Sequence, residues 1–281
     1  LPSLILADYD FSHRAGDLAI LRELAGLARI LQAPVVAGAS PGFFDFRHAA
    51  HVFALPDPGA RLADPAHAGW REFQASDDAR WTALTINRFL QREPFVEEAT
   101  GHAEATDEGR PETFLWGRGI WLVGAAVARS VARHGHALDL AGPGGLFEGL
   151  PARAYPVAAN EKVPLSTEAP LPEQAALELS RAAFTPVVGK LRSHVALLPM
   201  TATAHRMRPG KLTVEGTLAY QLLAGRLAQF CTLLLDRLPG EGPQETVRFL
   251  GRELAGFLGP LAGGAEDAVT VEPGRTETDG T

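Results

Sequence analysis

The chain has 281 residues, a formal net charge of −7 at pH 7 and an apolar content of 46%. This composition is typical of a globular protein and unlike that of a disordered chain. The negative balance argues against nucleic acid and against an anionic membrane surface as the main partner, because both require a basic surface. Cys231 is the single cysteine, so the chain can form no internal disulfide and nothing indicates an oxidising compartment.

The first forty residues predict a strand, a helix and a second strand. Residues 3–7 form a short apolar run, residues 17–32 place apolar side chains at helical spacing, and residues 34–39 have the composition of a buried strand. A strand–helix–strand unit is typical of a parallel sheet. The chain starts without an initiator methionine or a basic leader and ends in a polar, turn-like stretch, so we expect a piece of a larger protein.

The middle of the chain alternates helical patterns with polar loops. Helices or helical turns are expected at residues 70–74, 88–91 and 114–134. Strands are expected at residues 81–86 and 136–140. Loops or turns are expected at the proline-interrupted stretch 43–69, the acidic stretch 96–111 and the glycine-rich stretch 142–149.

The last part of the chain predicts mainly helices. Residues 151–172 are expected to be irregular. Helices are expected at residues 173–183, 214–238 and 243–258, the last opened by a proline. Extended segments are expected at residues 185–188, 195–198 and 269–272. No segment has the long uncharged apolar run that is typical of a membrane helix.

Ser40 lies in the one short motif that matches a catalytic signature. Gly38-Ala39-Ser40-Pro41-Gly42 fits the G-x-S-x-G pattern of a nucleophile elbow and follows a predicted strand. Such an elbow uses the backbone N–H of the residue after the serine as an oxyanion donor, and Pro41 has no N–H. We therefore interpret the motif as a turn that ends the strand. A serine hydrolase that uses Ser40, with His48 or His51 as its base, remains the alternative function.

Two further patterns do not amount to a site. His48 and His51 stand three residues apart and could share a helix face, but no further metal ligand stands at a recognisable spacing. Residues 142–145 are rich in glycine but lack the lysine of a phosphate-binding loop. No reaction can be assembled from these residues, so we predict no catalytic residue, no cofactor and no metal.

Several longer motifs follow one another along most of the chain. Residues 6–13 have the sequence LADYDFSH, and residues 32–41 have the sequence QAPVVAGASP. Later blocks are WREF at 70–73, SDDARW at 76–81, LTINRFL at 84–90, LWG at 115–117 and GPGGLFEGLP at 142–151. In this order, the motifs resemble those of the large subunit of the type VI secretion contractile sheath, the TssC/VipB/EvpB family.

The resemblance assigns a set of residues to structure or assembly and none to catalysis. These residues are Asp8, Tyr9, Phe11, Trp70, Phe73, Asp78, Arg80, Trp81, Arg88, Phe89 and Trp116. The chain also departs from the family pattern. Asn87 stands where a proline is usual, and Gln229-Phe230 stand where His-Tyr is usual, so the chain resembles a divergent branch.

The resemblance implies an α/β fold with a mixed, largely parallel sheet and flanking helices, the fold of the sheath large subunit. It places residues 1–160 in the N-terminal part of the large-subunit domain. Residues 161–281 would belong to the C-terminal sheath domain, truncated before its last strands. Strands that link neighbouring subunits in the family would lie beyond these ends, so we expect the chain alone not to form a sheath.

The resemblance also implies a mechanical function. The expected partners are a small sheath subunit, other copies of the chain in a helical tube, an inner tube ring protein, a baseplate and, indirectly, a AAA+ ATPase that disassembles the contracted sheath. The expected location is the cytoplasm, with neither nucleic acid nor membrane as a partner.

Two structural expectations follow from the motif residues. Trp70, Phe73, Trp81, Phe89 and Trp116 are expected to be packed in one aromatic cluster or in adjoining clusters, because they offer no chemistry. Arg88 is expected to pair with a carboxylate or with backbone carbonyls, because a guanidinium group suits such pairing.

Overall fold

A four-stranded parallel sheet forms the centre of the protein. The structure is a computed structural model that describes residues 3–97, 101–107, 110–206, 213–238, 242–259 and 271. The sheet has the order β1-β2-β3-β9, with β1 (Ile5–Phe11), β2 (Val35–Ala39), β3 (Thr82–Ile86) and β9 (Thr185–Pro186). Each neighbouring pair is parallel, and β2 and β3 are buried along their whole length. Burial of both faces is typical of a parallel sheet covered by helices.

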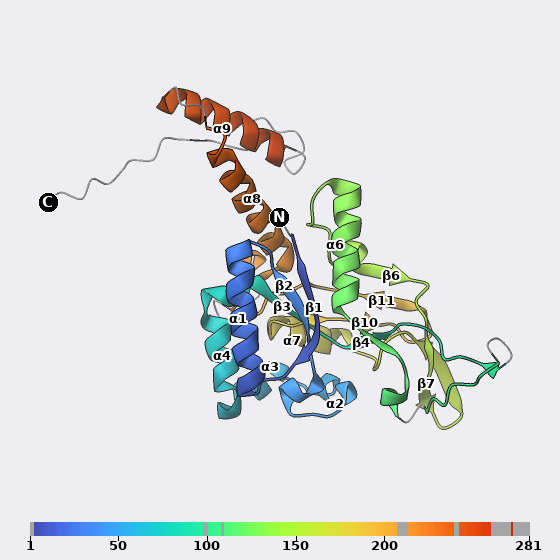
Figure 1. The fold of residues 1–281 in the computed structure, drawn as a ribbon. Helices are drawn as coiled ribbons and strands as arrows, with labels where there is room; N and C mark the ends of the chain where they lie inside the picture. Colours follow the sequence, from blue (N-terminus) through green and yellow to red (C-terminus); the bar gives the residue numbers. More distant parts are fainter. Residues whose placement is uncertain are drawn as a thin grey trace.

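Helices cover both faces of this sheet (Figure 1). On one face, α1 (Ala15–Leu31), α4 (Ala68–Ala75) and α7 (Glu173–Arg181) contribute to a first core around Phe43, Trp70 and Phe184. On the other face, α6 (Ile120–His134) and α8 (Leu218–Leu235) contribute to a second core. Ala37 of β2 belongs to the first core and the adjacent Val36 to the second, as the alternation of side chains along a strand requires.

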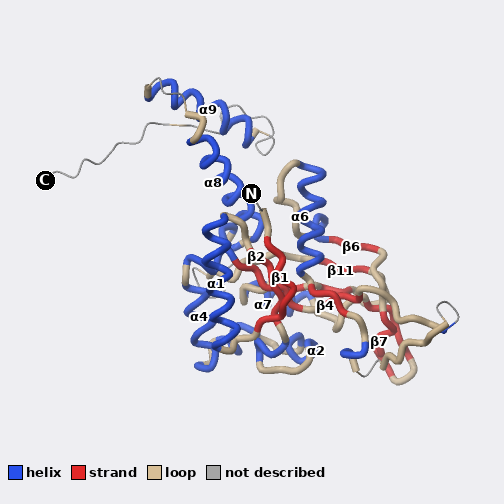
Figure 2. The backbone as a smooth tube through the Cα atoms, viewed as in Figure 1, coloured by secondary structure: helices blue, strands red, loops and turns tan. Residues whose placement is uncertain are grey.

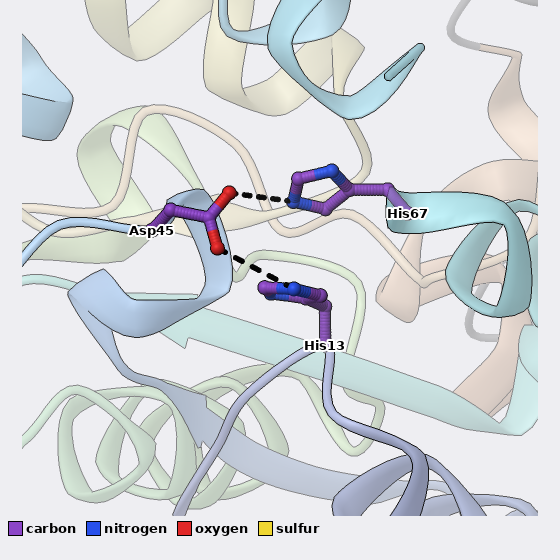
Figure 3. A group of neighbouring side chains, drawn as sticks. All are labelled: His13, Asp45 and His67. Carbon is purple, nitrogen blue, oxygen red and sulfur yellow. Dashed lines mark ion pairs between the residues drawn. The ribbon is translucent and has the colours of Figure 1, made fainter. Parts of the chain in front are cut away.

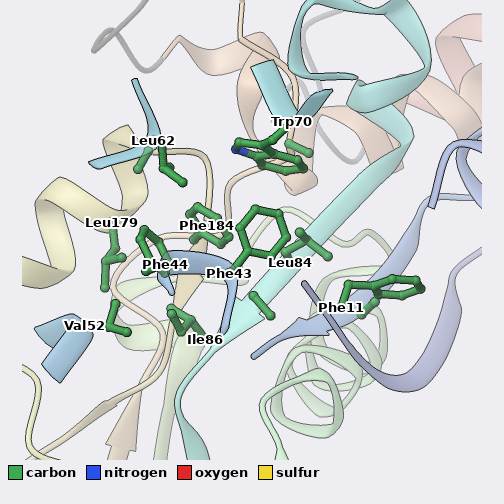
Figure 4. Packing of buried hydrophobic residues seen from close by; sticks show 14 of the residues in the cluster. Phe11, Phe43, Phe44, Val52, Leu62, Trp70, Leu84, Ile86, Leu179 and Phe184 are labelled. Carbon is green, nitrogen blue, oxygen red and sulfur yellow. The ribbon is translucent and has the colours of Figure 1, made fainter. Parts of the chain in front are cut away.

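Aromatic rings dominate the first core, which Figure 4 shows from close by. The ring of Phe43 contacts those of Trp70, at 4.7 Å between centroids, and Phe184, at 5.3 Å, both edge to face. Phe44 and Phe73 extend the same group. Edge-to-face pairs at these distances add to the free energy that burial alone provides.

Three smaller sheets lie beside the central one (Figure 2). They are β10-β11-β6 (Val188–Gly189, Val195–Leu197, Leu146–Glu148), β4-β5 (Arg88–Leu90, Trp116–Arg118) and β7-β8 (Arg153–Ala158, Glu161–Leu165). The remaining helices are α2 (Ala49–Phe53), α3 (Pro58–Leu62) and α9 (Pro243–Leu258). Short helical turns occupy Pro41–Phe44, Pro65–His67, Asp77–Trp81, Pro111–Thr113, Gly142–Gly145 and Val214–Gly216.

Several expected elements are confirmed, among them the first strand–helix–strand unit and the helices near residues 173–183 and 243–258. The expected loop at 43–69 contains α2 and α3. The expected strand at 269–272 lies outside the described residues, apart from Val271. The division at residue 160 stays a prediction, and the antiparallel hairpin β7-β8 spans that position.

Three predictions of secondary structure are wrong. Residues 88–91 were expected as a helical turn, but residues 88–90 form strand β4, which pairs with β5. Because β5 occupies residues 116–118, the helix expected at 114–134 begins only at Ile120. Residues 151–172, expected to be irregular, contain the hairpin β7-β8, whose Pro156 and Pro164 concealed its strands. Residues 136–140 form no strand. Long-range pairing overrides local propensity in the first two cases.

The last helices extend away from the sheets (Figure 1). In the described part of the chain, α8 is by length and composition apolar enough to cross a membrane, although it contains Arg226 and so is not an uncharged run. Core helices of soluble proteins pass the same test. Leu218 and Leu222 of α8 pack in the second core, and Gly225 approaches the Gln32 carbonyl oxygen so closely that a Cβ would lie 2.4 Å from it.

Candidate functional site

Charged side chains gather at the carboxyl end of β1. Asp8 and Asp10 leave β1 on the same side, and both meet Arg118 of β5. The Arg118 Nη1 donates to Asp8 Oδ1 at 2.8 Å, and its Nε lies 3.0 Å from Asp10 Oδ2. Burial raises the pKa of Asp10 above its ordinary value, while Arg118 and Arg88 oppose this rise. Arg118 therefore ties strand β5 to the edge strand of the central sheet.

A second ion pair joins Arg88 of β4 to Glu168. The Arg88 Nε donates to Glu168 Oε2 at 2.7 Å, and the backbone N–H of Glu168 donates to the Arg88 carbonyl oxygen at 2.9 Å. The Glu168 carboxylate is buried, whereas Arg88 is partly exposed. The expectation that Arg88 pairs with a carboxylate is thus confirmed. This pair fixes the segment after β8 against the strand that follows β3.

Asn87 connects β3 to β4 in a backbone conformation that proline cannot adopt. Its φ is 78°, in the left-handed region, whereas the proline ring fixes φ near −65°. The Asn87 Nδ2 donates to the carbonyl oxygens of Ala169, at 3.0 Å, and Val187, at 2.8 Å. Its Oδ1 accepts from the N–H of Arg88 at 3.1 Å. The departure from the family pattern at this position therefore accompanies a local hydrogen-bond network built around the asparagine.

A cavity of about 220 Å³ lies among these groups, at the carboxyl ends of the central strands. Its charged lining residues are Asp10, Arg47, Arg88, Arg118 and Glu168. Ligands of open α/β sheets commonly bind at this edge. Here both carboxylates are engaged by Arg88 and Arg118. The arrangement holds together segments that lie far apart in the sequence.

The close approach of β1 and β2 at this edge depends on Gly38. A Cβ at Gly38 would lie 2.0 Å from Asp10 Oδ1 and 3.1 Å from the Tyr9 carbonyl oxygen. The register of the β1–β2 pair shifts between Ala7 and Asp10, which is where the Asp10 side chain turns over β2. Glycine is required here by space rather than by backbone conformation.

Ser40 has the environment of a structural turn. Its Oγ donates to the Phe11 carbonyl oxygen at 3.1 Å, and Pro41 begins the helical turn that follows. Among the described residues, no hydrogen bond joins Ser40 to a histidine. The rings of His48 and His51 face each other at 5.9 Å and line a different cavity from the one that Ser40 lines with Asp10. The serine hydrolase alternative therefore has no support.

The five aromatic motif residues lie in different places. Trp70 and Phe73 pack in the first core with ring centroids 5.7 Å apart. Trp81 is buried in a small separate group with Ala28 and Val35, while Phe89 packs against the second core. Trp116 is partly buried and donates from Nε1 to the Pro111 carbonyl oxygen at 2.6 Å. The rings are thus distributed over both faces of the sheet and form no single cluster.

The remaining motif residues stabilise local structure. Phe11 is buried in the first core, whereas Tyr9 is half exposed and its hydroxyl lies 3.4 Å from Asp17 Oδ1. Asp78 pairs with Arg29 of α1 at 2.7 Å. Arg80 pairs with Asp77 and lies 3.3 Å from His205 Nε2. Sequence reasoning placed Asp78 and Arg80 in the right motif but identified none of these partners.

Sequence reasoning also missed the partners at the charged edge. Asp10 stands inside the LADYDFSH motif with no predicted role, and no motif contains Arg118. The spacing Asp8-x-Asp10 on a strand was an available signal, because alternate residues of a strand face the same side. Arg129 of α6, which no motif contains either, donates to the carbonyl oxygens of Leu146 and Gly144.

The departure at Gln229-Phe230 also has a structural role. Gln229 of α8 is buried, and its Nε2 donates to the carbonyl oxygen of Leu31 at 2.9 Å. Phe230 stacks on Phe257 of α9 with centroids 4.6 Å apart. These two residues connect α8 to the end of α1 on one side and to α9 on the other.

Comparison with known proteins identifies the family. The chain is similar to the type VI secretion system sheath protein TssC1 of Pseudomonas aeruginosa, with 28% identity over 203 residues. This match covers 68% of the chain but 40% of the relative, so the chain spans less than half of the length of that protein. The model of the VipB family, described as the EvpB/VC_A0108 tail sheath N-terminal domain, matches residues 2–205. Because this match covers well over half of the 281 residues, the chain belongs to the VipB family of tail sheath N-terminal domains.

Proposed function

We propose that the chain is part of a structural subunit of the type VI secretion contractile sheath. The subunit assembles with a small sheath subunit and with further copies of itself around an inner tube, and contraction drives that tube outward. The observation that carries this proposal is the family match over residues 2–205. The chain has no catalytic task in this role and needs no cofactor.

The geometry supports a structural role. The motif residues are either packed in the cores, as Trp70 and Phe73 are, or engaged in ion pairs, as Asp8 and Arg88 are. Buried and paired side chains of this kind preserve a rigid subunit rather than perform chemistry. A subunit that transmits force through a lattice benefits from such rigidity, because interfaces between rigid bodies move as units.

An exposed apolar stripe on α1 supports assembly with other subunits. Ile20, Leu27 and Leu31 stand at intervals of seven and four residues, which places them on one side of the helix. Each is exposed by more than a third of its surface. Large apolar side chains exposed on one side of a helix make that side a candidate for protein–protein interaction.

The further partners follow from the same role. They are an inner tube ring protein, a baseplate and, acting after contraction, a AAA+ ATPase. The proposed place of action is the cytoplasm, with no nucleic acid and no membrane as a partner. The net charge of −7 supports the exclusion of nucleic acid, because binding to phosphates requires a basic surface.

Coexpression tests the proposal. The complete gene that contains this sequence is expressed with the gene of the small sheath subunit from the same genome, and the product is imaged by negative-stain electron microscopy. We expect the two proteins to copurify and to form regular hollow tubules. Separate, unassembled proteins under conditions in which a related sheath forms would contradict the proposal.

The α1 stripe provides a sharper version of the same experiment. The double variant Leu27→Glu/Leu31→Glu places charge on the stripe without touching either core, so it should remain folded but form fewer tubules. Leu177→Glu on α7 is the matched control, because Leu177 is an exposed leucine away from the stripe. Equal tubule yields from the stripe variant and from the control would remove the stripe from the proposed interface.

A further inference from the structure

Two histidines and an aspartate meet beside the first core, at the carboxyl side of β1 and β2 (Figure 3). His13 lies in the loop after β1, Asp45 ends the helical turn after β2, and His67 precedes α4. His13 Nε2 lies 3.4 Å from Asp45 Oδ1, and His67 Nε2 lies 3.8 Å from Asp45 Oδ2. One ligand atom from each residue lies within 4.8 Å of the other two. Sequence reasoning missed this group, because it tested only His48 and His51 as ligands.

The hydrogen bonds of His13 leave its Nε2 facing the carboxylate as an acceptor. Its Nδ1 lies 3.2 Å from the Gly42 carbonyl oxygen. A carbonyl oxygen only accepts, so Nδ1 carries the hydrogen and the neutral ring has its lone pair on Nε2. Two acceptors, Nε2 and the Asp45 carboxylate, then face each other and need a cation between them. A backbone carbonyl on the other ring nitrogen is the usual partner of a metal-binding histidine.

His67 brings a second imidazole to the same point from a buried position. Its side chain is inaccessible to solvent, and its Nε2 lies 3.0 Å from the Phe43 carbonyl oxygen. That oxygen only accepts, so Nε2 carries the hydrogen in this arrangement and can bind an ion only once the hydrogen has moved to Nδ1. The Phe43 carbonyl oxygen lies close enough to act as a further oxygen ligand. The rings of His13 and His67 are 4.3 Å apart between centroids and tilted by 36°.

Two of the ligand-atom distances fit a small metal ion after modest contraction, and the third lies within 4.8 Å. Ligand atoms bound tetrahedrally at zinc–nitrogen distances lie about 3.4 Å from one another. The His13–Asp45 distance already has this value, and the His67–Asp45 distance exceeds it by a few tenths of an ångström. Arg61 donates from Nη2 to Asp45 Oδ2 at 2.8 Å, which orients the carboxylate in the way that ligating carboxylates are commonly held.

We propose that His13, Asp45 and His67 bind a divalent transition-metal ion of the zinc type. Two imidazoles and one carboxylate are ligands that such ions prefer, whereas Mg²⁺ and Ca²⁺ prefer oxygen alone. His13 and Asp45 also line a surface hollow of about 470 Å³, which gives the ion a path from solvent. The ion joins three loops that lie far apart in the sequence, so its binding stabilises the folded chain.

Metal titration of the chelator-treated, full-length protein tests the proposal. Zn²⁺ is followed by calorimetry and by the thermal unfolding midpoint, and Co²⁺ by the visible absorption of a low-symmetry site. We expect one Zn²⁺ per chain and an increase in the midpoint. The variants His13→Gln and His67→Gln should each weaken binding at least tenfold. The double variant His48→Gln/His51→Gln is the control and should bind as the unmodified protein does.

The outcomes separate a metal site from an ordinary ion pair. If a proton on His13 is the only cation at this point, the unmodified protein shows no saturable binding of Zn²⁺, and the proposal is overturned. Binding that is lost in the His48/His51 control but kept in His13→Gln overturns it as well. His67 is buried, so His67→Gln is judged only if its circular dichroism matches that of the unmodified protein. If the circular dichroism differs, His13→Gln alone decides the test, because His13 lies at the margin of the site.

Discussion

The aromatic residues around α4 and the charged residues at the end of β1 belong to one body but differ in what surrounds them. Trp70 and Phe73 are enclosed by other apolar side chains, and several rings share each contact. Asp10 pairs with Arg118 at a partly open edge, and Arg118 pairs with Asp8 as well. The first region therefore depends on filled volume, while the second depends on a few specific contacts between charged side chains.

This difference indicates separate roles for the two sets of motif residues. Burial of apolar side chains supplies most of the free energy of folding and is not directional. Ion pairs at a partly exposed edge supply little free energy but fix which segments lie side by side. In a sheath subunit, the aromatic set would maintain the body, and the charged set would hold β5 and the segment after β8 in register with the central sheet.

Trp70→Ala should have the largest effect on stability. Trp70 is completely buried and contacts Phe43, Phe73 and Phe184, so its removal leaves a large cavity. We expect the free energy of unfolding to fall by about 3–5 kcal/mol, measured by urea denaturation. Trp121→Ala is the matched control on α6, because Trp121 is 46% exposed and should lose much less. Equal losses in the two variants would refute the description of the first core.

Gly38→Ala should cause the next largest loss of stability, because Gly38 lies in the buried strand β2 directly against Asp10 of the charged edge. The new methyl group would meet Asp10 Oδ1 at 2.0 Å, and the Asp10 side chain is held by Arg118. Overpacking of this kind costs about 1–3 kcal/mol. Combining it with Asp10→Ala removes the obstructing carboxylate, so the double variant should recover part of the loss. No recovery would place the steric conflict at the Tyr9 backbone instead.

The Arg88–Glu168 pair should show a smaller, specific coupling. A double-mutant cycle with Arg88→Ala and Glu168→Ala isolates the interaction energy. We expect roughly 1–2 kcal/mol, because the carboxylate is buried but the guanidinium is partly exposed. The exposed pair Arg110–Asp107 is the comparison and should give at most about 0.5 kcal/mol. Similar coupling energies for the two pairs would show that burial of Glu168 has no consequence.

The parts of the fold that follow local periodicity could be predicted from the sequence. The apolar spacing in residues 15–31 and the buried runs around it predicted α1 and its two flanking strands. Strands that exist through pairing with distant residues could not be predicted in this way. Strand β4 has three residues and gains its conformation from β5, nearly thirty positions away.

The candidate site was predictable to the level of motifs but not of contacts. The motif that contains Arg88 predicted a carboxylate partner, yet nothing local indicated Glu168, which is eighty positions away. The same limit applies to His67, whose neighbours His13 and Asp45 reach it from other loops. Asn87 illustrates a different limit. The sequence showed that Asn87 departs from the family pattern, but only the structure explains the departure, through the φ of 78° and the two carbonyl oxygens that accept from its side chain.

Asp10→Asn should have the smallest effect, and it should be stabilising at neutral pH. Burial raises the pKa of Asp10 above its ordinary value of 3.8, despite Arg118 and Arg88. Between 3.8 and this higher value, the folded chain holds a proton at Asp10 that the unfolded chain has lost. The unmodified protein therefore loses stability as the pH rises through this window, whereas an asparagine, which has the shape of the protonated form, avoids the loss.

The gain from Asp10→Asn should be small, since Asp10 keeps partial access to solvent and Arg118 opposes the rise of its pKa. Urea denaturation at a series of pH values from 7 to 4 measures it. The advantage of the asparagine should shrink as the pH falls, because protonation of Asp10 makes the two proteins alike.

Asp8→Asn is the control. Asp8 pairs with the same Arg118 from a half-exposed position, so its replacement should cost a little stability at pH 7 and bring no gain. A loss of stability in Asp10→Asn at pH 7, as large as that in Asp8→Asn or larger, would mean that the ion pair with Arg118 outweighs the cost of burying the carboxylate. The charged edge would then contribute to stability in its own right, and the contrast with the aromatic core would narrow.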